Sequence, residues 1–397
     1  MITWPRERSR EVRYEKSPVR DTGWETSNTR VIFYSMDLTN KAVKATPAFS
    51  LHTFAPGWGA SVMGTGVISV VFTSMAVAGF LPGFSNAMAL VFFWITVVVA
   101  IPVLGVTTAR WIVAPRKVLD DLHHPVKGAM MATFPGGILV LGIAVGRAGQ
   151  SIFGFEAARV IAMILAVIGG VLALVVGFIF ITRFLSRGDM KHPMITGAWF
   201  IPPVVTVLVP PALVPFMQDP TAGQRELLWL SWILLGFGTF LYLSITTVLF
   251  YRSLTFPPPP AQLAPTLIIG AGPAGVISLD ISLLTQASVR LEAAPESIVA
   301  LSSPVGLMFW GFGLWWLLAA VIMLYRSYDK LHFALSWWAF SFPLGAWVVA
   351  GITLAGITAS SIIAVIALIG VPILLALWIA VVAGTTKGLV DGSIWAD

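Results

Sequence analysis

Residues 332–351, HFALSWWAFSFPLGAWVVAG, are long enough to cross a lipid bilayer and contain no formally charged side chain. Pro343 interrupts this stretch near its middle, shortly after Phe340 and Phe342. A proline inside a membrane helix frees a backbone carbonyl and kinks the helix, which is tolerated only where protein or water meets the freed group. The stretch is therefore predicted to be a broken membrane helix in the interior of the protein.

The composition extends this interpretation to the whole chain. Of its 397 residues, 57% are hydrophobic and only 11% are charged, whereas about a quarter of the residues in a soluble protein are charged. Because a hydrocarbon core of about 30 Å requires roughly 20 apolar residues per helix, the sequence predicts an all-α integral membrane protein with ten transmembrane helices. The predicted spans are residues 57–81, 87–110, 129–147, 159–184, 194–216, 227–251, 265–284, 300–324, 332–356 and 358–384.

The two ends of the chain are predicted to lie outside the membrane. Residues 1–50 carry nine Lys and Arg and no apolar core of signal-peptide length, so we expect a cytoplasmic, largely mobile tail and not a cleaved leader. Residues 51–386 form the predicted ten-helix transport domain, and residues 387–397 form a short cytoplasmic C-terminal tail. Cysteine is absent, which excludes disulfides, thiolate metal sites and cysteine nucleophiles.

The basic residues indicate the orientation in the membrane. When the loops are assigned alternately to the two sides, twenty Lys and Arg fall on the side of the N-terminal tail and four on the other. Basic loops remain in the cytoplasm, so both termini are predicted to be cytoplasmic, with the protein in the inner (plasma) membrane. The net charge of +6 reflects this topology, and no nucleic-acid partner is expected.

Interruptions of the same kind recur about every seventy residues. They fall at Pro135, Pro202, Pro273 and Pro343, which are separated by 67, 71 and 70 residues. Projection of one more period toward the N-terminus reaches residues 63–66, where Gly64 and Gly66 replace the proline. The odd spans are broken and rich in small residues, while the even spans are smooth and apolar. The sequence therefore predicts five parallel helical-hairpin repeats around a central pore, which the kinked odd helices line and the even helices surround.

Few residues offer enzymatic chemistry. The string from Gly270 to Gly275 matches the GxGxxG pattern of dinucleotide sites, but it lies inside an apolar span with no strand before it. A kinked membrane helix explains these glycines better, and no catalytic triad or metal site is indicated. We therefore expect no enzymatic activity, no cofactor and no metal.

Ionisable side chains within membrane spans mark transport paths by default. Asp280, toward the outer end of the seventh span, is the one acid considered as a proton-coupling group. The scarcity of central charges also fits a passive anion path, since a buried carboxylate would repel the solute. Membrane proteins that transport nothing avoid central charges as well, so this feature alone does not decide.

The histidines cluster in the sequence near the predicted cytoplasmic starts of odd spans, at His52, His123, His124, His192 and His332. The N-termini of the odd helices, with their positive dipole ends, face the same side. One hypothesis is a ring of His52, His124, His192 and His332 at the inner mouth, which gains charge near neutral pH and attracts anions. The alternative is that these are interfacial residues that cap helices.

The two phenylalanines at the break of the ninth span also allow two interpretations. An aromatic side chain at a kink can close a narrow pore by excluding water, as hydrophobic constrictions do. Ordinary packing is the alternative for Phe340 and Phe342, and the spacing alone favours it.

Five segments follow one another along the chain: GWGASVMGTGVISVVF, HPVKGAMMATFPGGIL, AWFIPPVVTVL, IGAGPAGVISLDIS and WWAFSFPLGAW. Together they resemble the tellurite-resistance/dicarboxylate transporter family. That family includes bacterial TehA proteins, fungal malate permeases and sulfite exporters, and the slow-type anion channels of plant guard cells. The resemblance covers all ten spans, from about residue 54 to residue 384.

The resemblance implies a ten-helix protomer whose odd helices line a central pore, commonly assembled as a homotrimer with one pore per protomer. In the channel members, a phenylalanine on the ninth helix occludes the pore. The matching segment here is WAFSFP, which places the gate at Phe342, with Phe340 as the second choice. The glycines that the family keeps on its first helix match Gly64 and Gly66. Channels and coupled carriers share this framework, so it indicates neither a given solute nor tellurite resistance.

Three classes of function follow. The leading prediction is a gated channel, or a channel-like exporter, that passes small anions across the lipid bilayer. The alternative is a carrier for C4-dicarboxylates such as malate, either coupled to protons through Asp280 or acting as a uniporter. The third class is a receptor or scaffold that transports nothing and signals through the basic tail.

Overall fold

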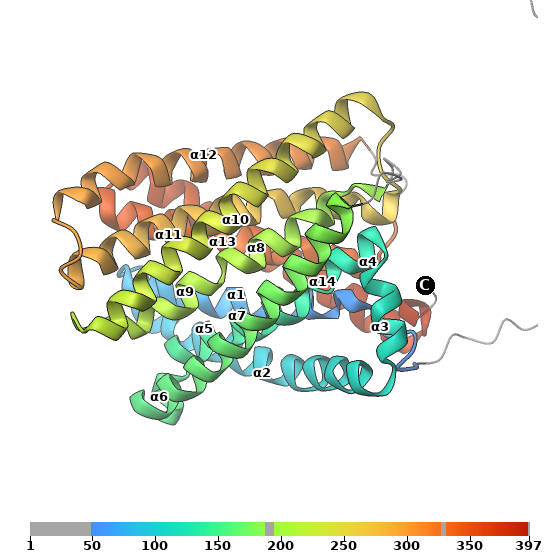
Figure 1. The fold of residues 1–397 in the computed structure, drawn as a ribbon, viewed down its shortest axis with the longest axis horizontal. Helices are drawn as coiled ribbons and strands as arrows, with labels where there is room; N and C mark the ends of the chain where they lie inside the picture. Colours follow the sequence, from blue (N-terminus) through green and yellow to red (C-terminus); the bar gives the residue numbers. More distant parts are fainter. Residues whose placement is uncertain (1–48, 187–193, 327–330, 396–397) are drawn as a thin grey trace, which may run out of the picture. The chain divides into compact units, whose positions relative to one another are not determined.

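The computed structural model describes residues 49–186, 194–326 and 331–395. The chain divides into two compact units, residues 1–45 and residues 46–397, and only the second contains described residues (Figure 1). The predicted N-terminal tail up to residue 48, and His192 of the predicted histidine ring, therefore lie outside the described residues.

Ten helical segments in the described ranges are long and apolar enough to cross a membrane. The same ranges contain helices and connecting turns but no β-strand. The prediction of an all-α membrane protein with ten spans is thereby confirmed. The spans are Pro56–Val77, Pro82–Val113, Pro125–Arg147, Phe155–Leu185, Gly197–Phe216, Ala222–Thr255, Ala261–Arg290, Ser297–Tyr325, Leu335–Thr358 and Ser361–Val390.

The even-numbered spans are single long helices that face outward. They are α2 (Pro82–Val113), α7 (Phe155–Leu185), α10 (Ala222–Thr255), α12 (Ser297–Tyr325) and α14 (Ser361–Val390). Only 22–39% of the residues in their most apolar stretches are buried, against 78–100% in the odd-numbered spans. A long helix that is apolar on all sides and yet exposed is stable only in lipid, so the even helices form the layer that faces the bilayer.

The odd-numbered spans are composite, and each changes its helical geometry along its length. A 3-10 helix or a short α-helix comes first, and a further α-helix follows. The elements are η1 (Pro56–Trp58) and α1 (Gly59–Val77); α4 (Pro125–Met130) and α5 (Thr133–Arg147); η3 (Gly197–Phe200), α8 (Ile201–Val207), α9 (Val209–Leu213) and η4 (Val214–Phe216); η5 (Ala261–Gly270) and α11 (Ala271–Arg290); and η7 (Leu335–Phe340) and α13 (Ser341–Thr358).

The recurring prolines begin the α-helical parts of these spans. Pro135, Pro203, Pro273 and Pro343 are each the third residue of their helix, in α5, α8, α11 and α13. The first four N–H groups of an α-helix have no partner within it, so a proline there removes no intrahelical hydrogen bond. The prolines thus mark helix starts inside the spans and not kinks in continuous helices. Pro202, the predicted break of the fifth span, is the second residue of α8, and its neighbour Pro203 holds the recurring place.

The first span makes the same change of geometry without a proline. The third residue of α1 is Ser61, whose hydroxyl donates to the carbonyl oxygen of Trp58 (2.7 Å) and so satisfies a backbone group at the change. Gly64 and Gly66 lie further along α1, which is described throughout and continuous across both. The change of helical geometry in this span falls before these glycines, between Trp58 and Gly59.

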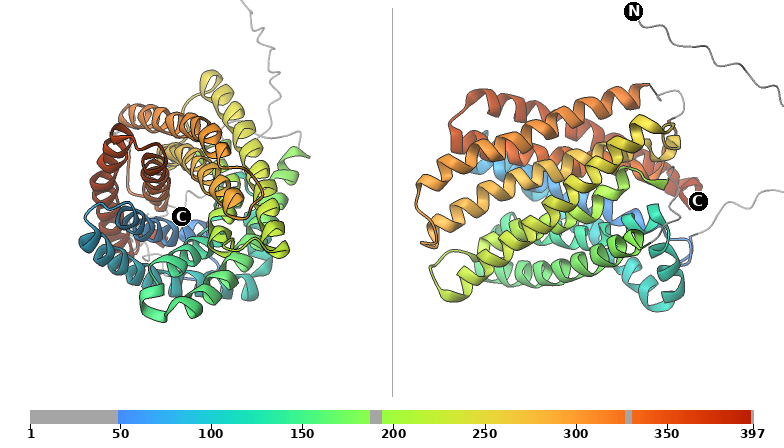
Figure 2. Two further views of the ribbon diagram at one scale, coloured as in Figure 1. Left: turned by 90° about the vertical axis from the view of Figure 1, so that its left-hand side faces the viewer. Right: turned by 45° about the horizontal axis from the view of Figure 1, so that its top comes forward.

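The α-helical parts of the odd spans surround one axis. Helix α1 packs against α5 and α13, α13 packs against α11, and α8 and α9 complete the circle between α11 and α5. Each outer helix packs on the inner helix of its own hairpin, as α2 does on α1 and α14 on α13. The left panel of Figure 2 looks along the helices and shows this arrangement. It matches the predicted parallel hairpins with odd helices inside and even helices outside.

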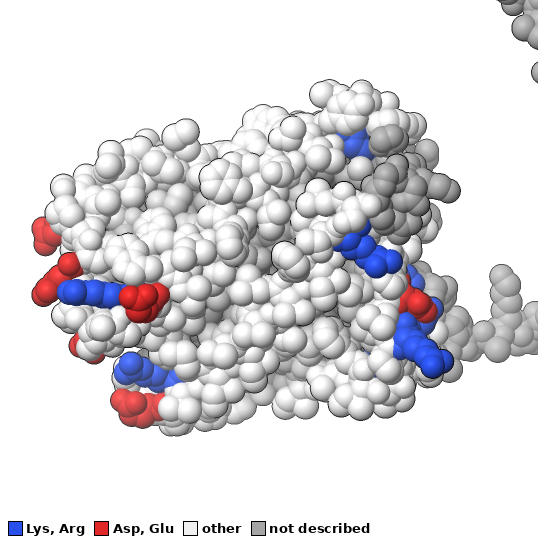
Figure 3. All heavy atoms as spheres, in the orientation of Figure 1, with Lys and Arg blue, Asp and Glu red and all other residues white. Residues whose placement is uncertain are grey.

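The charged side chains gather at the two ends of the bundle (Figure 3). Where the odd spans begin and the even spans end, the described residues include eight Lys and Arg against three Asp, while the opposite end carries four Arg against five Asp and Glu. We call the first of these the basic end. Its charged residues are Arg110, Arg116, Lys117, Asp120, Asp121, Lys127, Arg183, Arg252, Arg326, Lys387 and Asp391. Helix α3 (Pro115–Leu122) and the 3-10 helix η8 (Ser393–Trp395) lie at the basic end, and α6 (Gln150–Phe153) lies at the other.

Candidate functional site

Phe340 and Phe342 lie on either side of the change from η7 to α13. Phe340 is the last residue of η7, Phe342 is the second residue of α13, and their side chains are 8% and 5% exposed. The ring of Phe340 meets that of Trp337 edge-on, with 5.5 Å between centroids, and Trp337 in turn contacts Phe333. Within the described ranges, Phe342 takes part in no such ring contact. Phe340 thus belongs to an aromatic cluster, whereas Phe342 is a separate buried ring at the start of an inner helix.

Gly64 of α1 faces this helix start. A Cβ atom at Gly64 would overlap the hydroxyl of Ser341 and would lie 3.1 Å from the ring of Trp338. Ser341 is itself held in place, because its hydroxyl donates to the carbonyl oxygen of Trp338 (3.0 Å). The glycine therefore lets α1 approach the segment that carries both phenylalanines.

Gly66, the other predicted glycine of α1, serves a different contact. A Cβ atom there would lie 2.7 Å from Val140 of α5 and 3.2 Å from Thr96 of α2. Gly66 is thus a packing position between three helices, and of the two glycines only Gly64 adjoins the candidate gate.

Helix α11 contacts the start of α13 as well. A Cβ atom at Gly272 would lie 3.4 Å from Pro343, and one at Gly275 would lie 2.8 Å from the backbone of Trp347. The third glycine of the GxGxxG string, Gly270, is covered by the ring of Trp316. All three glycines are positions of close helix packing, which supports the interpretation of this string as part of a membrane helix.

A pair of tryptophans fixes α13 against the outer helix α12. The rings of Trp310 and Trp347 stack at 4.8 Å between centroids with an angle of 3° between their planes. Each indole N–H donates to the backbone carbonyl of the other residue, at 3.1 and 3.0 Å. Sequence reasoning missed this pair, because the two residues belong to different hairpins and no local pattern joins them.

The inner helices all direct the positive ends of their dipoles toward the same end of the bundle. Five α-helices of the inner ring (α1, α5, α8, α11 and α13) begin inside their spans, and all five N-terminal ends point toward the basic end. The positive end of the helix dipole makes such a helix start favourable for an anion. In transporters with discontinuous membrane helices, these ends point at anionic groups of the substrate. The arrangement can therefore attract anions to the axis without a basic side chain at its centre.

Of the predicted histidine ring, His124 has a defined structural role. Its Nδ1 accepts hydrogen bonds from the backbone N–H groups of Val126 and Lys127 at the start of α4, both at 3.2 Å. Burial lowers the pKa of His124 and nearby Lys127 lowers it further, against an opposing effect of Asp121. The neutral imidazole therefore caps α4, and at this position the structure favours the capping alternative.

The remaining histidines of the described ranges lie in separate segments. His52 and His332 are exposed and precede η1 and η7, and His123 follows α3. The ring stays a prediction for His52 and His332.

Asp280 lies in the middle of α11 and is fully buried. Neither of its carboxylate oxygens has a hydrogen-bond partner among the described residues. The neighbouring hydroxyls bond elsewhere, with Ser278 donating to the carbonyl of Gly306 and Ser282 to that of Ser278. An unpaired buried carboxylate is energetically expensive, and acids inside membrane helices mark ion or proton paths by default. Asp280 is therefore a candidate functional residue on an inner helix.

A groove of about 450 Å³ lies between the outer helices α2 and α14. Two hydrogen bonds cross at its floor, from Trp378 of α14 to Thr65 of α1 and from Trp338 of η7 to Thr385 of α14, both at 3.1 Å. The second bond ties η7, which carries Phe340, to the last outer helix. The lining of the groove is mostly apolar and comes largely from the two outer helices.

Comparisons with known proteins agree with this architecture. Residues 53–386 match the SLAC1 family, which is described as voltage-dependent anion channel. The chain is 34% and 31% identical to two uncharacterized transporters of Methanocaldococcus jannaschii, over 75% of this chain in each case and over 82% and 84% of the relatives. It is 24% identical to a sulfite efflux pump of Arthroderma benhamiae, over 78% of this chain and 84% of that protein.

The family match runs from the turn before η1 to the last turns of α14, so it includes all ten spans. The resemblance inferred from the five sequence segments is confirmed, as is the absence of an enzymatic role, since the family consists of channels and transporters. The chain therefore belongs to the SLAC1 family and is a multi-pass membrane protein that transports anions.

Proposed function

We propose that this protein is a gated anion channel or channel-like exporter, whose path follows the axis of the five inner helices and is closed by Phe342. The observation that carries the proposal is the position of Phe342 in the first turn of α13, buried where α1 and α11 both approach that helix start. The close contacts at Gly64 and Gly272 leave little space beside this turn. A hydrophobic constriction of this kind excludes water and ions until it moves.

Selectivity for anions arises from backbone groups. The five helix N-termini point toward the basic end, and in this proposal that end faces the cytoplasm across an inner (plasma) membrane, as its excess of Lys and Arg supports. Anions are thus attracted from the cytoplasmic side, which suits export. As the sequence resemblance implies, the protomers assemble as homotrimers with one path in each.

The solutes are small inorganic anions. The relative from Arthroderma benhamiae is described as a sulfite efflux pump, and sulfite is a compact inorganic anion. We propose chloride, nitrate and sulfite as the first anions to test with this protein.

Anion current through purified protein in a planar bilayer tests the gate. We expect little or no current for the wild type and a large chloride or nitrate current for Phe342→Ala, because this change removes the ring that closes the path. Phe340→Ala is the matched control, since its ring packs against Trp337, and its current should resemble that of the wild type. Equal currents from both variants, or no current from Phe342→Ala, would contradict a gate at Phe342.

A second candidate function is a C4-dicarboxylate carrier of the malate type, and Asp280 favours it. A buried acid without a hydrogen-bond partner on an inner helix can exchange a proton during a transport cycle. Malate uptake into liposomes that follows a pH gradient, and that is lost in Asp280→Asn, would establish this carrier. Uptake of malate that is unchanged in Asp280→Asn would exclude Asp280 as the coupling group.

A further inference from the structure

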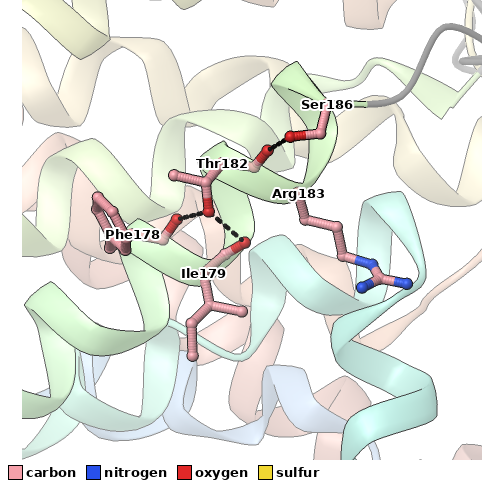
Figure 4. Close-up of a pocket in the computed structure, with 5 residues that line it drawn as sticks. All are labelled: Phe178, Ile179, Thr182, Arg183 and Ser186. Carbon is pink, nitrogen blue, oxygen red and sulfur yellow. Dashed lines mark hydrogen bonds between the residues drawn. The ribbon is translucent and has the colours of Figure 1, made fainter.

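An open hollow of about 530 Å³ lies along α7 where this outer helix reaches the basic end (Figure 4). It is lined by Phe178, Ile179, Thr182, Arg183 and Ser186. Phe178 and Ile179, about two turns before the end of the helix, are 72% and 40% exposed. The hollow thus has an apolar part toward the middle of the membrane and a polar, cationic part at the membrane boundary.

No described residue compensates the charge of Arg183. Its Nε atom is buried and forms no hydrogen bond, and no ion pair with a described residue involves Arg183. Arg110 has the corresponding place near the end of α2, yet it pairs with Asp121 and donates from Nε to the carbonyl oxygen of Leu51 (3.0 Å). Figure 4 shows the guanidinium of Arg183 reaching away from α7 toward the neighbouring teal segment, where α4 packs against α7. Of these two arginines, Arg183 alone keeps donors available for a ligand.

The other polar groups of the hollow do not compete for this ligand. The hydroxyl of Thr182 donates to the carbonyl oxygen of Phe178 (2.7 Å), and that of Ser186 donates to the carbonyl oxygen of Thr182 (2.8 Å). Both hydroxyl protons are therefore used within α7, as the dashed lines in Figure 4 show. The guanidinium is left as the donor of the hollow, so the ligand must be an acceptor, and a forked guanidinium matches the oxygens of a phosphate.

We propose that this hollow binds an anionic phospholipid of the leaflet at the basic end, with its phosphate against Arg183 and its acyl chains along Phe178 and Ile179. Helix α7 faces lipid, since only 39% of its most apolar stretch is buried. Basic pockets beside membrane helices bind lipid headgroups at such positions, and the excess of basic residues at this end favours an anionic lipid. A soluble anion would have no use for the exposed apolar half. This inference is independent of the proposed gate and of the transported solute.

Native mass spectrometry of the purified full chain tests the proposal by titration with dioleoyl phosphatidylglycerol, dioleoyl phosphatidylcholine or inorganic phosphate. We expect phosphatidylglycerol to bind more tightly than phosphatidylcholine, and Arg183→Gln to weaken its binding about tenfold through loss of charge-assisted hydrogen bonds. The matched control is Arg116→Gln, an exposed arginine at the same end but outside the hollow, which should bind like the wild type.

Two results would overturn the proposal. One is equal binding of phosphatidylglycerol by Arg183→Gln and the wild type. The other is Arg183-dependent binding of inorganic phosphate without preference for the anionic lipid, which would indicate a soluble-anion site. A phosphatidylglycerol analogue with a diazirine in its acyl chain provides a test on the unmodified protein. Its cross-links should fall within residues 178–186, and cross-links found only on other helices would contradict the proposal. Because this test uses the wild-type protein, its result does not depend on whether Arg183→Gln folds.

Discussion

Helices α1 and α13 are neighbours in the inner ring, yet they begin in different ways. Helix α13 follows six residues of 3-10 helix and carries Pro343 as its third residue, whereas α1 follows three residues of 3-10 helix and carries Ser61 there. Both starts are held by a serine hydroxyl that donates to a tryptophan carbonyl, Ser61 to Trp58 and Ser341 to Trp338. The shared feature is thus a satisfied carbonyl at the change of geometry, and proline is one of two ways to begin the helix.

The comparison also separates two roles. In the proposed gate, α13 contributes the bulky ring of Phe342, while α1 contributes the small surface at Gly64, which lies against Ser341 and Trp338. A hydrophobic constriction needs both the aromatic side chain and a facing helix at close distance, because only then is water excluded between them. The following predictions test the two helix starts against each other, from the largest expected effect to the smallest.

The contact between the two helices is the most sensitive point. We expect Gly64→Val to destabilise the protein by about 3 kcal/mol, because the new side chain overlaps Ser341 in a filled interior. It should also raise anion flux if α13 is displaced from α1. Unfolding in detergent and flux in liposomes measure the two effects. The control is Gly105→Val, where a Cβ atom meets nothing within 4 Å, and its stability should stay within about 1 kcal/mol of the wild type.

A proline can be placed in α1 at the third helical position, which Pro343 occupies in α13. We expect Ser61→Pro to fold and to lose only about 1 kcal/mol, the value of the missing hydroxyl hydrogen bond, because the third N–H of an α-helix has no intrahelical partner. Val67→Pro, in the interior of the same helix, should cost about 3 kcal/mol or more. Equal losses in the two variants would show that Ser61 does not correspond to Pro343.

The hydroxyls of Ser61 and Ser341 should contribute equally to the free energy of unfolding. We expect Ser61→Ala and Ser341→Ala each to lower the free energy of unfolding by about 1 kcal/mol, since each leaves a carbonyl at a helix start without its side-chain donor. Chemical denaturation of both variants in one detergent gives the comparison. A much larger loss for Ser341→Ala would mean that α13 relies on its hydroxyl in a way that α1 does not.

The smallest effect concerns a third start, that of α4 at His124. Since burial lowers the pKa of this base, the folded protein binds its proton less readily than the unfolded chain. The stabilising cap is complete above the unfolded pKa of about 6.5 and is lost as the pH falls through that value toward the folded pKa. We expect the wild type to lose at most about 1 kcal/mol between pH 8 and pH 5.5. His124→Asn, which caps without titrating, should lose less over the same range, and an identical loss would contradict the capping role.

Much of the fold was predictable from the sequence, because the bilayer leaves few choices. The ten spans follow from the length of apolar segments, and the distinction of inner from outer helices follows from small residues and prolines such as Pro273 and Pro343. The two candidate gate residues named from the sequence, Phe340 and Phe342, flank the observed change from η7 to α13, and the gate itself stays a prediction. The structure distinguishes these two rings by their contacts, as only Phe340 packs against Trp337.

What the sequence determined by itself was the number, alternation and repeat of the spans, because hydrophobicity, residue size and proline act locally along the chain. What only the tertiary structure decided was how the spans meet. The contact of Gly64 with Ser341 and the pairing of Trp310 with Trp347 join residues from different hairpins, and the lack of a described hydrogen-bond partner for Asp280 depends on the helices packed around it. Packing and hydrogen bonding between helices leave no pattern in the sequence of any single helix. These features are therefore decided only when the inner helices pack against one another in the folded protein.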